Sequence, residues 1–147
     1  MHRPREVTIL LVEDDPGHAR LIEKSLRRSG IINQITTVGD GQQAIDYLLN
    51  EGEHAGSQRA PRLLVLLDLN LPVLDGCQVL ERMKADERTR RIPVVVLTTT
   101  DDPREVSRCY ELGCSVYITK PVDHAQFSEA IRKLGLFLSI VTISNGE

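Results

Sequence analysis

Five short apolar runs recur along the chain, and their arrangement constrains the fold more than any other feature of the sequence. The runs cover Val7–Val12, Ile35–Val38, Leu63–Leu67, Pro93–Leu97 and Val116–Thr119. The first, third and fourth runs are rich in Val, Ile and Leu and do not alternate with polar residues. Such continuous runs are typical of parallel strands that are covered on both faces.

The segments between the runs carry apolar residues at helical spacing. Ala19, Ile22 and Leu26 fall at i, i+3 and i+7, and similar stripes lie within Val106–Gly113 and Phe127–Leu134. Residues that favour helix starts precede the predicted helices, namely Asp15 before Pro16, Asp40, Asp75, Asp101 or Asp102 before Pro103, and Asp123. Gly30 and Gly113 are expected to end two of these helices.

This alternation of strand and helix, repeated five times, predicts an α/β fold with a doubly wound parallel (βα)5 sheet. Because crossovers between parallel strands are right-handed, few windings remain, and the flavodoxin-like strand order 2-1-3-4-5 is the common one at this size. The 147 residues predict a single domain, 1–147. We expect its core at about 7–134, a surface loop at Asn50–Arg62, and an apolar extension of the last helix at 135–147.

The composition excludes several classes of protein. Against 18 Lys and Arg stand 21 Asp and Glu, and aromatic residues make up 3% of the chain, so we expect no nucleic-acid partner, which would need a basic face. The late apolar stretch Leu134–Ile143 is half the length of a membrane helix, which needs about 20 residues, so no membrane association is expected. The three cysteines lack metal-type spacing, and we interpret them as small core residues of a cytoplasmic protein.

Acidic, basic or hydroxyl side chains follow four of the predicted strands. In chain order they are Glu13, Asp14 and Asp15, then Asp68, then Thr98 and Thr99, then Lys120. Open α/β sheets bind ligands beyond the carboxyl ends of their strands. We therefore expect these side chains to share one site, except that Asp15, directly before Pro16, is expected to cap the first helix.

The residue types in this cluster predict a site that accepts a phosphoryl group. Glu13, Asp14 and Asp68 would repel one another unless a cation intervened, and hard oxygen ligands suit Mg²⁺, for which Mn²⁺ could substitute. Asp68, at the centre of the sheet, is then the expected nucleophile toward phosphorus. Lys120 supplies a mobile cation, and the Thr98 hydroxyl can hydrogen-bond a new phosphoryl oxygen.

Four motifs now resemble a known family, the receiver domain of bacterial two-component response regulators. The motifs are Val12-Glu13-Asp14-Asp15-Pro16, Leu66-Leu67-Asp68-Leu69-Asn70-Leu71-Pro72-Val73-Leu74-Asp75-Gly76, Val96-Leu97-Thr98-Thr99 and Tyr117-Ile118-Thr119-Lys120-Pro121. The resemblance runs from about Val7 to Leu134. It implies that Asp68 is phosphorylated by a sensor histidine kinase, that Asp14 binds the metal directly, that Glu13 holds it through water, and that the backbone carbonyl of Asn70 is a further ligand.

The resemblance also implies a switch. Thr98 would move toward the phosphoryl group while the ring of Tyr117 turns inward, and Lys120 would bridge to a phosphoryl oxygen. The bond between Lys120 and Pro121 would be cis. Thr99 either tunes access to the phosphate or faces solvent.

A narrower resemblance concerns the insertion Asn50–Arg62 and the segment Leu134–Phe137. Both are similar to the small single-domain regulators that pair with bacterial phytochrome kinases. With 13 residues after Leu134, we expect a stand-alone switch that is not an enzyme and that signals through a downstream protein partner.

Three other functions fit these residues less well. A haloacid-dehalogenase-type phosphatase also uses a carboxylate nucleophile, Mg²⁺, a Thr and a Lys, but it needs an acid two residues after the nucleophile, where this chain has Asn70. Flavin binding is disfavoured by the charges of Glu13, Asp14 and Asp15 at the first loop. A regulator that no longer accepts phosphate is disfavoured by the complete residue set.

The apolar stretch Leu134–Ile143, called the apolar tail below, is consistent with two structures. It is either a longer last helix folded against the sheet or an interface. We expect a homodimer, or a docking surface, formed through Leu134, Phe137, Leu138 and Val141.

Overall fold

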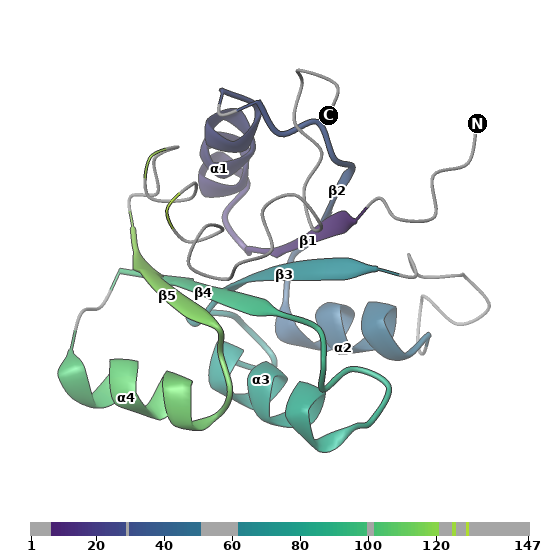
Figure 1. Ribbon diagram of the computed structural model, residues 1–147, viewed down its shortest axis with the longest axis vertical. Helices are drawn as coiled ribbons and strands as arrows, with labels where there is room; N and C mark the ends of the chain where they lie inside the picture. Colours follow the sequence, from purple (N-terminus) through teal and green to yellow (C-terminus); the bar gives the residue numbers. More distant parts are fainter. Residues whose placement is uncertain are drawn as a thin grey trace.

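The computed structural model describes residues 7–28, 30–50, 62–99, 102–120, 125 and 129. Its centre is a parallel sheet of five strands in the order β2-β1-β3-β4-β5 (Figure 1). The strands are β1 Thr8–Val12, β2 Ile35–Val38, β3 Leu63–Asp68, β4 Val94–Thr98 and β5 Val116–Thr119. The predicted fold class and strand order are confirmed.

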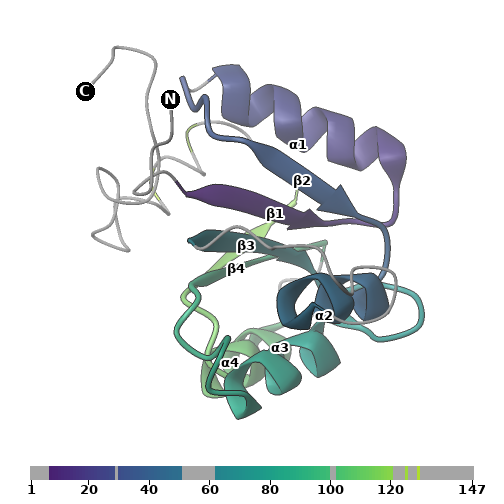
Figure 2. The same ribbon diagram turned by 90° about the vertical axis from the view of Figure 1, so that its right-hand side faces the viewer.

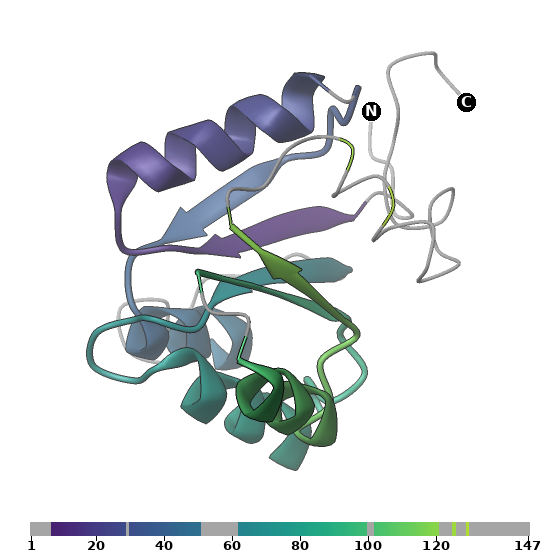
Figure 3. The same ribbon diagram turned by 90° about the vertical axis from the view of Figure 1, so that its left-hand side faces the viewer.

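The helices of the described residues cover both faces of this sheet. They are α1 Pro16–Arg28, α2 Gly41–Leu49, α3 Gly76–Ala85 and α4 Pro103–Glu111. Helix α1 packs on one face, and α2, α3 and α4 lie on the other, as the two side views show (Figures 2 and 3). The fifth predicted helix lies outside the described residues except for 125 and 129, which are helical. Pro121, the apolar extension at 135–147 and the predicted surface loop, except Asn50 and Arg62 at its ends, also lie outside them.

Strand β1 shows how one strand serves both layers, because successive side chains point to opposite faces. Ile9 and Leu11 pack with the α1 residues Ala19, Ile22 and Leu26. Leu10 and Val12 pack in the core under α2, α3 and α4. Both faces are therefore apolar, which explains the absence of polar alternation in the run.

The helix ends follow the predicted capping chemistry. Asp40 and Asp75 each accept a backbone N–H as N-caps, and Asp75 forms a capping box with Gln78. Of the two predicted caps of α4, Asp102 accepts the backbone N–H of Arg104 as N-cap, and Asp101 lies outside the described residues. Gly30 and Gly113 follow α1 and α4 with φ of 90° and 105°, a backbone conformation that glycine adopts without steric cost.

One predicted stripe is only partly buried. Of the α4 residues at helical spacing, Cys109 is buried, whereas Tyr110 is 49% exposed. Helix α4 lies beside the edge strand β5, so a narrower face of it is covered. Among the described residues, no helix has the length and apolar character needed to cross a membrane.

Candidate functional site

Three carboxylates gather at the carboxyl ends of β1 and β3. Glu13, Asp14 and Asp68 each place an oxygen within 4.8 Å of the others. Glu13 is 3% exposed and Asp68 is 4% exposed, whereas Asp14 faces solvent. The three acids therefore lie together, as predicted, at the carboxyl ends of the strands.

Asp68 is the last residue of β3 and still pairs with Leu97 of β4, so the strand extends one residue beyond the predicted run. Its Oδ1 accepts the backbone N–H of Asn70 at 3.0 Å. The start of α3 packs closely beneath, because a Cβ at Gly76 would lie 2.6 Å from the Asp68 carbonyl oxygen. Glycine is thus required there, and the rigid strand end fixes the carboxylate.

Lys120 connects the two buried carboxylates. Its Nζ lies 2.6 Å from Oε1 of Glu13 and 3.1 Å from Oδ2 of Asp68. Its backbone N–H donates to the carbonyl of Thr98 at 2.6 Å, which fixes the residue at the end of β5 beside β4. The ammonium group therefore reaches across the sheet edge to acids from two other strands.

Burial and charge act against each other in this cluster. Burial raises the pKa of Glu13, the hydrogen bond from Lys120 lowers it, and the repulsion from Asp68 adds to the rise, so the net pKa is raised. Burial alone would lower the pKa of Lys120, but its hydrogen bonds to Glu13 and Asp68 outweigh burial and raise it. Lys120 therefore remains an ammonium at neutral pH.

The other predicted site residues lie at neighbouring strand ends. Thr98 is the buried last residue of β4, and Thr99 follows it and is exposed. Tyr117 of β5 is half-buried, sits opposite Val96 and packs against the core under α3 and α4. Asn70 is exposed.

Asp15 and His18 lie near the three acids, at the start of α1. Asp15 is confirmed as the cap of α1, because its Oδ1 accepts the backbone N–H groups of Gly17 and His18 at 2.8 and 3.1 Å. His18 was not selected as a site residue, yet its Nδ1 lies 3.9 Å from Oε2 of Glu13. His18 could have been predicted from its place in the first turn of a helix that directly follows an acidic strand end.

The donor set suits a hard divalent cation. All three ligand groups are carboxylates, and their summed charge of −3 exceeds the +1 of Lys120, so the cluster retains an excess negative charge. Oxygen ligands, one of them open to solvent, match the preference of Mg²⁺ for carboxylates and retained waters.

The family follows from this fold and from sequence comparison. The response regulator receiver domain matches residues 9–132, and the chain belongs to that family. Its members are phosphoryl-accepting switches of two-component signalling. The chain is 42% identical over 127 residues to the probable methanogenesis regulatory protein FilR2 of Methanothrix harundinacea, covering 86% of this chain and 79% of that protein. It is 43% identical over 112 residues to the response regulator Rcp1 of Synechocystis, covering 76% of this chain and 75% of Rcp1.

Solved structures of response regulators, several of them phytochrome response regulators, resemble this chain. The bacteriophytochrome response regulator RtBRR superposes with a TM-score of 0.82 at 40% identity, covering 91% of this chain and 81% of that one. The phosphorylated cyanobacterial phytochrome response regulator RcpA gives 0.75 at 40% identity, over 94% and 98% of the two chains. The Mn²⁺-bound form of Rcp1 gives 0.73 at 37% identity, over 93% and 98%. Phytochrome-associated response regulators are thus among the homologues of this chain.

Proposed function

We propose that this protein is a response regulator in which Asp68 accepts a phosphoryl group from a sensor histidine kinase. One observation carries the proposal. A nearly buried carboxylate at the end of the central strand lies 3.1 Å from an ammonium group and within 4.8 Å of two further carboxylates. This combination of nucleophile, cation and metal ligands is what phosphoryl transfer to a carboxylate requires.

The metal proposed for the site is Mg²⁺, for which Mn²⁺ can substitute. Asp14 and Asp68 would bind it directly, Glu13 would bind it through water, and the backbone carbonyl of Asn70 would complete the protein ligands. The clustering of the three carboxylates supports this set, as does the Mn²⁺ bound to the homologue Rcp1. When bound, the ion neutralises negative charge on the transferring phosphoryl oxygens.

Phosphoryl transfer would use Asp68 as the nucleophile, with Asn70 and Lys120 positioning its carboxylate. A carboxylate oxygen of Asp68 forms a bond to phosphorus, and the phosphorus–nitrogen bond of the kinase phosphohistidine breaks, leaving its electron pair on the imidazole. The Asn70 N–H, 3.0 Å from Oδ1, and the Lys120 ammonium hold the carboxylate in place. As charge develops on the phosphoryl oxygens, Lys120 bridges to one of them from Oδ2 of Asp68.

The output proposed is a change in protein contacts. Thr98 would hydrogen-bond the phosphoryl group, and Tyr117 would turn inward behind it, which shifts α4 and β5 toward an active arrangement. Thr99, exposed beside Thr98, would tune access to the acyl phosphate. The proposed cis bond between Lys120 and Pro121 stays a prediction.

The proposed partners are a histidine kinase of the phytochrome type, supported by the homologues RtBRR and RcpA, and a downstream protein. A phosphatase activity is not proposed, because Asn70 stands where the leaving-group acid would be needed. The switch would therefore not be an enzyme, and its cytoplasmic location stays a prediction.

Intact mass measurement tests the proposal. The full chain is incubated with Mg²⁺ and acetyl phosphate, and we expect one added phosphoryl group that is absent from Asp68→Asn and from wild type without Mg²⁺. Asp75→Asn, which alters a helix cap and not the cluster, is the matched control and should be phosphorylated. An unchanged adduct in Asp68→Asn, or no adduct in the wild type, would refute the assignment.

A further inference from the structure

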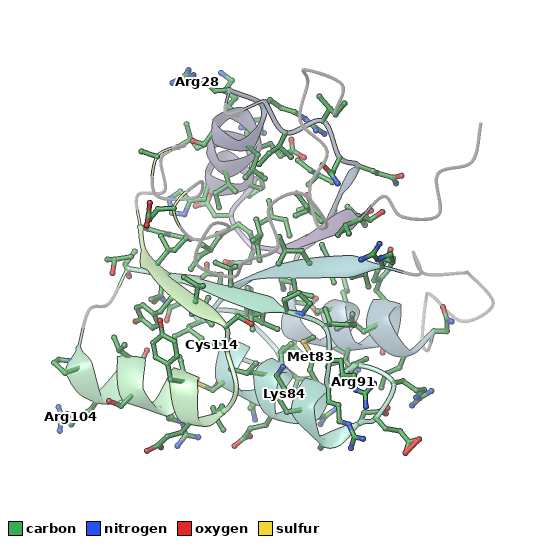
Figure 4. The ribbon with its side chains drawn as sticks, viewed as in Figure 1. Arg28, Met83, Lys84, Arg91, Arg104 and Cys114 are labelled. Carbon is green, nitrogen blue, oxygen red and sulfur yellow. The ribbon has the colours of Figure 1, made fainter. Side chains whose placement is uncertain are left out.

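Lys84 is a charged residue on the largely apolar face of the sheet that α3 and α4 cover. The same face holds the cysteines, of which Cys109 and Cys114 are buried, as predicted, and Cys77 is half-buried. Figure 4 shows Lys84 on α3, together with Cys114 near the start of β5. Lys84 is half-buried, so its charge is partly removed from water.

The side chain of Lys84 is held from its stem to its nitrogen. Its Nζ donates a hydrogen bond to the carbonyl of Arg90 at 2.9 Å. The stem runs across Gly113, between α4 and β5, because a Cβ at Gly113 would lie 3.0 Å from Cε and 3.2 Å from Cδ and Cγ of Lys84. The nitrogen is therefore kept in one place, at a position that small molecules in solvent can still reach.

Two carboxylates close to Lys84 in the chain are paired with arginines instead. Asp86 accepts hydrogen bonds from Nε and Nη2 of Arg88 at 3.0 and 2.8 Å. Oε2 of Glu81 lies 3.7 Å from Nη2 of Arg108. Among the residues that the structure describes, Lys84 forms no ion pair, and its nitrogen contacts a neutral carbonyl.

Lys84 and Lys120 are both half-buried, yet their surroundings act on them in opposite directions. Burial lowers the pKa of Lys84. Burial also acts to lower the pKa of Lys120, but its hydrogen bonds to Glu13 and Asp68 outweigh burial and raise it. An unpaired and poorly solvated lysine releases its proton more readily, and the neutral amine is the nucleophilic form.

We propose that Lys84 is a site of acetylation by acyl phosphates, of which acetyl phosphate is a simple example. The neutral Nζ attacks the carbonyl carbon of the reagent and forms a carbon–nitrogen bond. The bond from that carbon to the phosphate oxygen breaks, the phosphate leaves with the electron pair, and the nitrogen releases one proton to water. The products are acetyl-lysine and inorganic phosphate. The inference does not depend on phosphorylation of Asp68.

Acetylation would remove the charge of Lys84 and keep a hydrogen-bond donor. The amide product retains one N–H, which can still donate to the carbonyl of Arg90, while the charge that burial disfavours is gone. Because the stem of Lys84 lies against Gly113, the charge is lost beside the turn that leads into β5. The modification would therefore be a chemical input separate from the acid cluster.

The test incubates the full chain with acetyl phosphate and EDTA, so that phosphorylation of Asp68 is not expected, and maps acetylation by peptide mass spectrometry. We expect Lys84 to be acetylated several-fold faster than Lys24, an exposed lysine of α1, and Lys120 to react more slowly than either. In guanidinium chloride Lys84 and Lys24 should react at equal rates, because the preference arises from the fold.

Lys84→Arg keeps the charge and the donor and should lose the fast adduct. Lys24→Arg is the matched control and should retain that adduct on Lys84. Circular dichroism of each variant establishes that it is folded.

Three outcomes would overturn the proposal. These are equal rates at Lys84 and Lys24 in the folded protein, a preference for Lys84 that persists in guanidinium chloride, and acetylation of Lys120 as fast as that of Lys84. Unchanged fast acetylation of a folded Lys84→Arg variant would equally show that another residue reacts. None of these results bears on phosphoryl transfer to Asp68, which the Mg²⁺-dependent mass increase measures separately.

Discussion

Lys120 and Glu13 form an ion pair across the edge of the sheet, with Nζ 2.6 Å from Oε1, although 107 residues separate them in the chain. Glu13 is almost completely buried, and the side chain of Lys120 is 10% exposed. The pair forms because β1 and β5 end at the same edge of a parallel sheet. The same ammonium contacts Asp68, so one cation compensates two acids.

Lys120→Met should destabilise the metal-free protein. Removing the cation leaves Glu13 and Asp68 buried side by side, which we expect to lower the free energy of unfolding by about 2–3 kcal/mol at neutral pH. Added Mg²⁺ should recover part of this loss, because a ligand that binds the folded state stabilises it. Urea unfolding with and without Mg²⁺ measures both effects.

Lys24→Met is the matched control, since Lys24 is an exposed residue of α1. It should leave the free energy of unfolding nearly unchanged and should not alter the response to Mg²⁺. Equal losses in the two variants would contradict a compensating role for Lys120.

Val73 holds a backbone conformation that β-branched residues rarely adopt. Its φ is 71° and its side chain is 73% exposed, so it bears the steric cost of the left-handed region without burying apolar surface. Val73→Asn should stabilise the protein by about 1 kcal/mol, because Asn tolerates this conformation. Thermal unfolding checks the change, and Val73→Ala, which lacks the local hydrogen bonding of Asn, should gain less. A less stable Asn variant would show that the conformation is not a source of strain.

Asp86 should titrate well below the usual range. Arg88 donates to its Oδ1 and Oδ2 from Nε and Nη2 at 3.0 and 2.8 Å, and these hydrogen bonds, with that of the Arg88 backbone N–H, lower the pKa of Asp86 from 3.8 to about 2. Since the pKa is depressed in the folded state, the contribution to stability is present above pH 3.8 and is lost as the pH falls toward 2.

An NMR titration of the Asp86 carboxyl carbon measures this pKa. Arg88→Met should raise it part of the way to 3.8, because the backbone hydrogen bond remains, while Arg91→Met should leave it unchanged. An Asp86 pKa that did not respond to Arg88→Met would contradict the proposed cause.

The apolar tail is predicted from sequence to form a dimer. Phe137→Glu in the full chain should shift the sedimentation coefficient from that of a dimer to that of a monomer, because a buried charge disrupts an apolar interface. Ser139→Glu adds the same charge at a polar position and should have less effect. A wild-type protein that already sediments as a monomer would rule out this dimer.

The strand order, and the set of polar side chains that lie together at one edge of the sheet, could be predicted from the sequence. Doubly covered strands must be apolar throughout, so Val7–Val12 and Leu63–Leu67 were recognisable as parallel strands. Right-handed crossovers left few windings, of which the order 2-1-3-4-5 is the common one at this size. Asp68 and Lys120 could be found because function in this architecture collects directly behind such strands. The helix cap at Asp75 could be predicted in the same way, because its partner Gln78 is three residues away in the chain.

Which of these groups are in contact depends on the tertiary structure. Lys120 could have paired with any acid at the sheet edge, and only the register of the strands brings its ammonium to Glu13 and Asp68 together while Asp14 stays in solvent. Contacts between distant residues depend on how the layers pack, and packing is a property of the whole fold, which no local pattern of residues encodes.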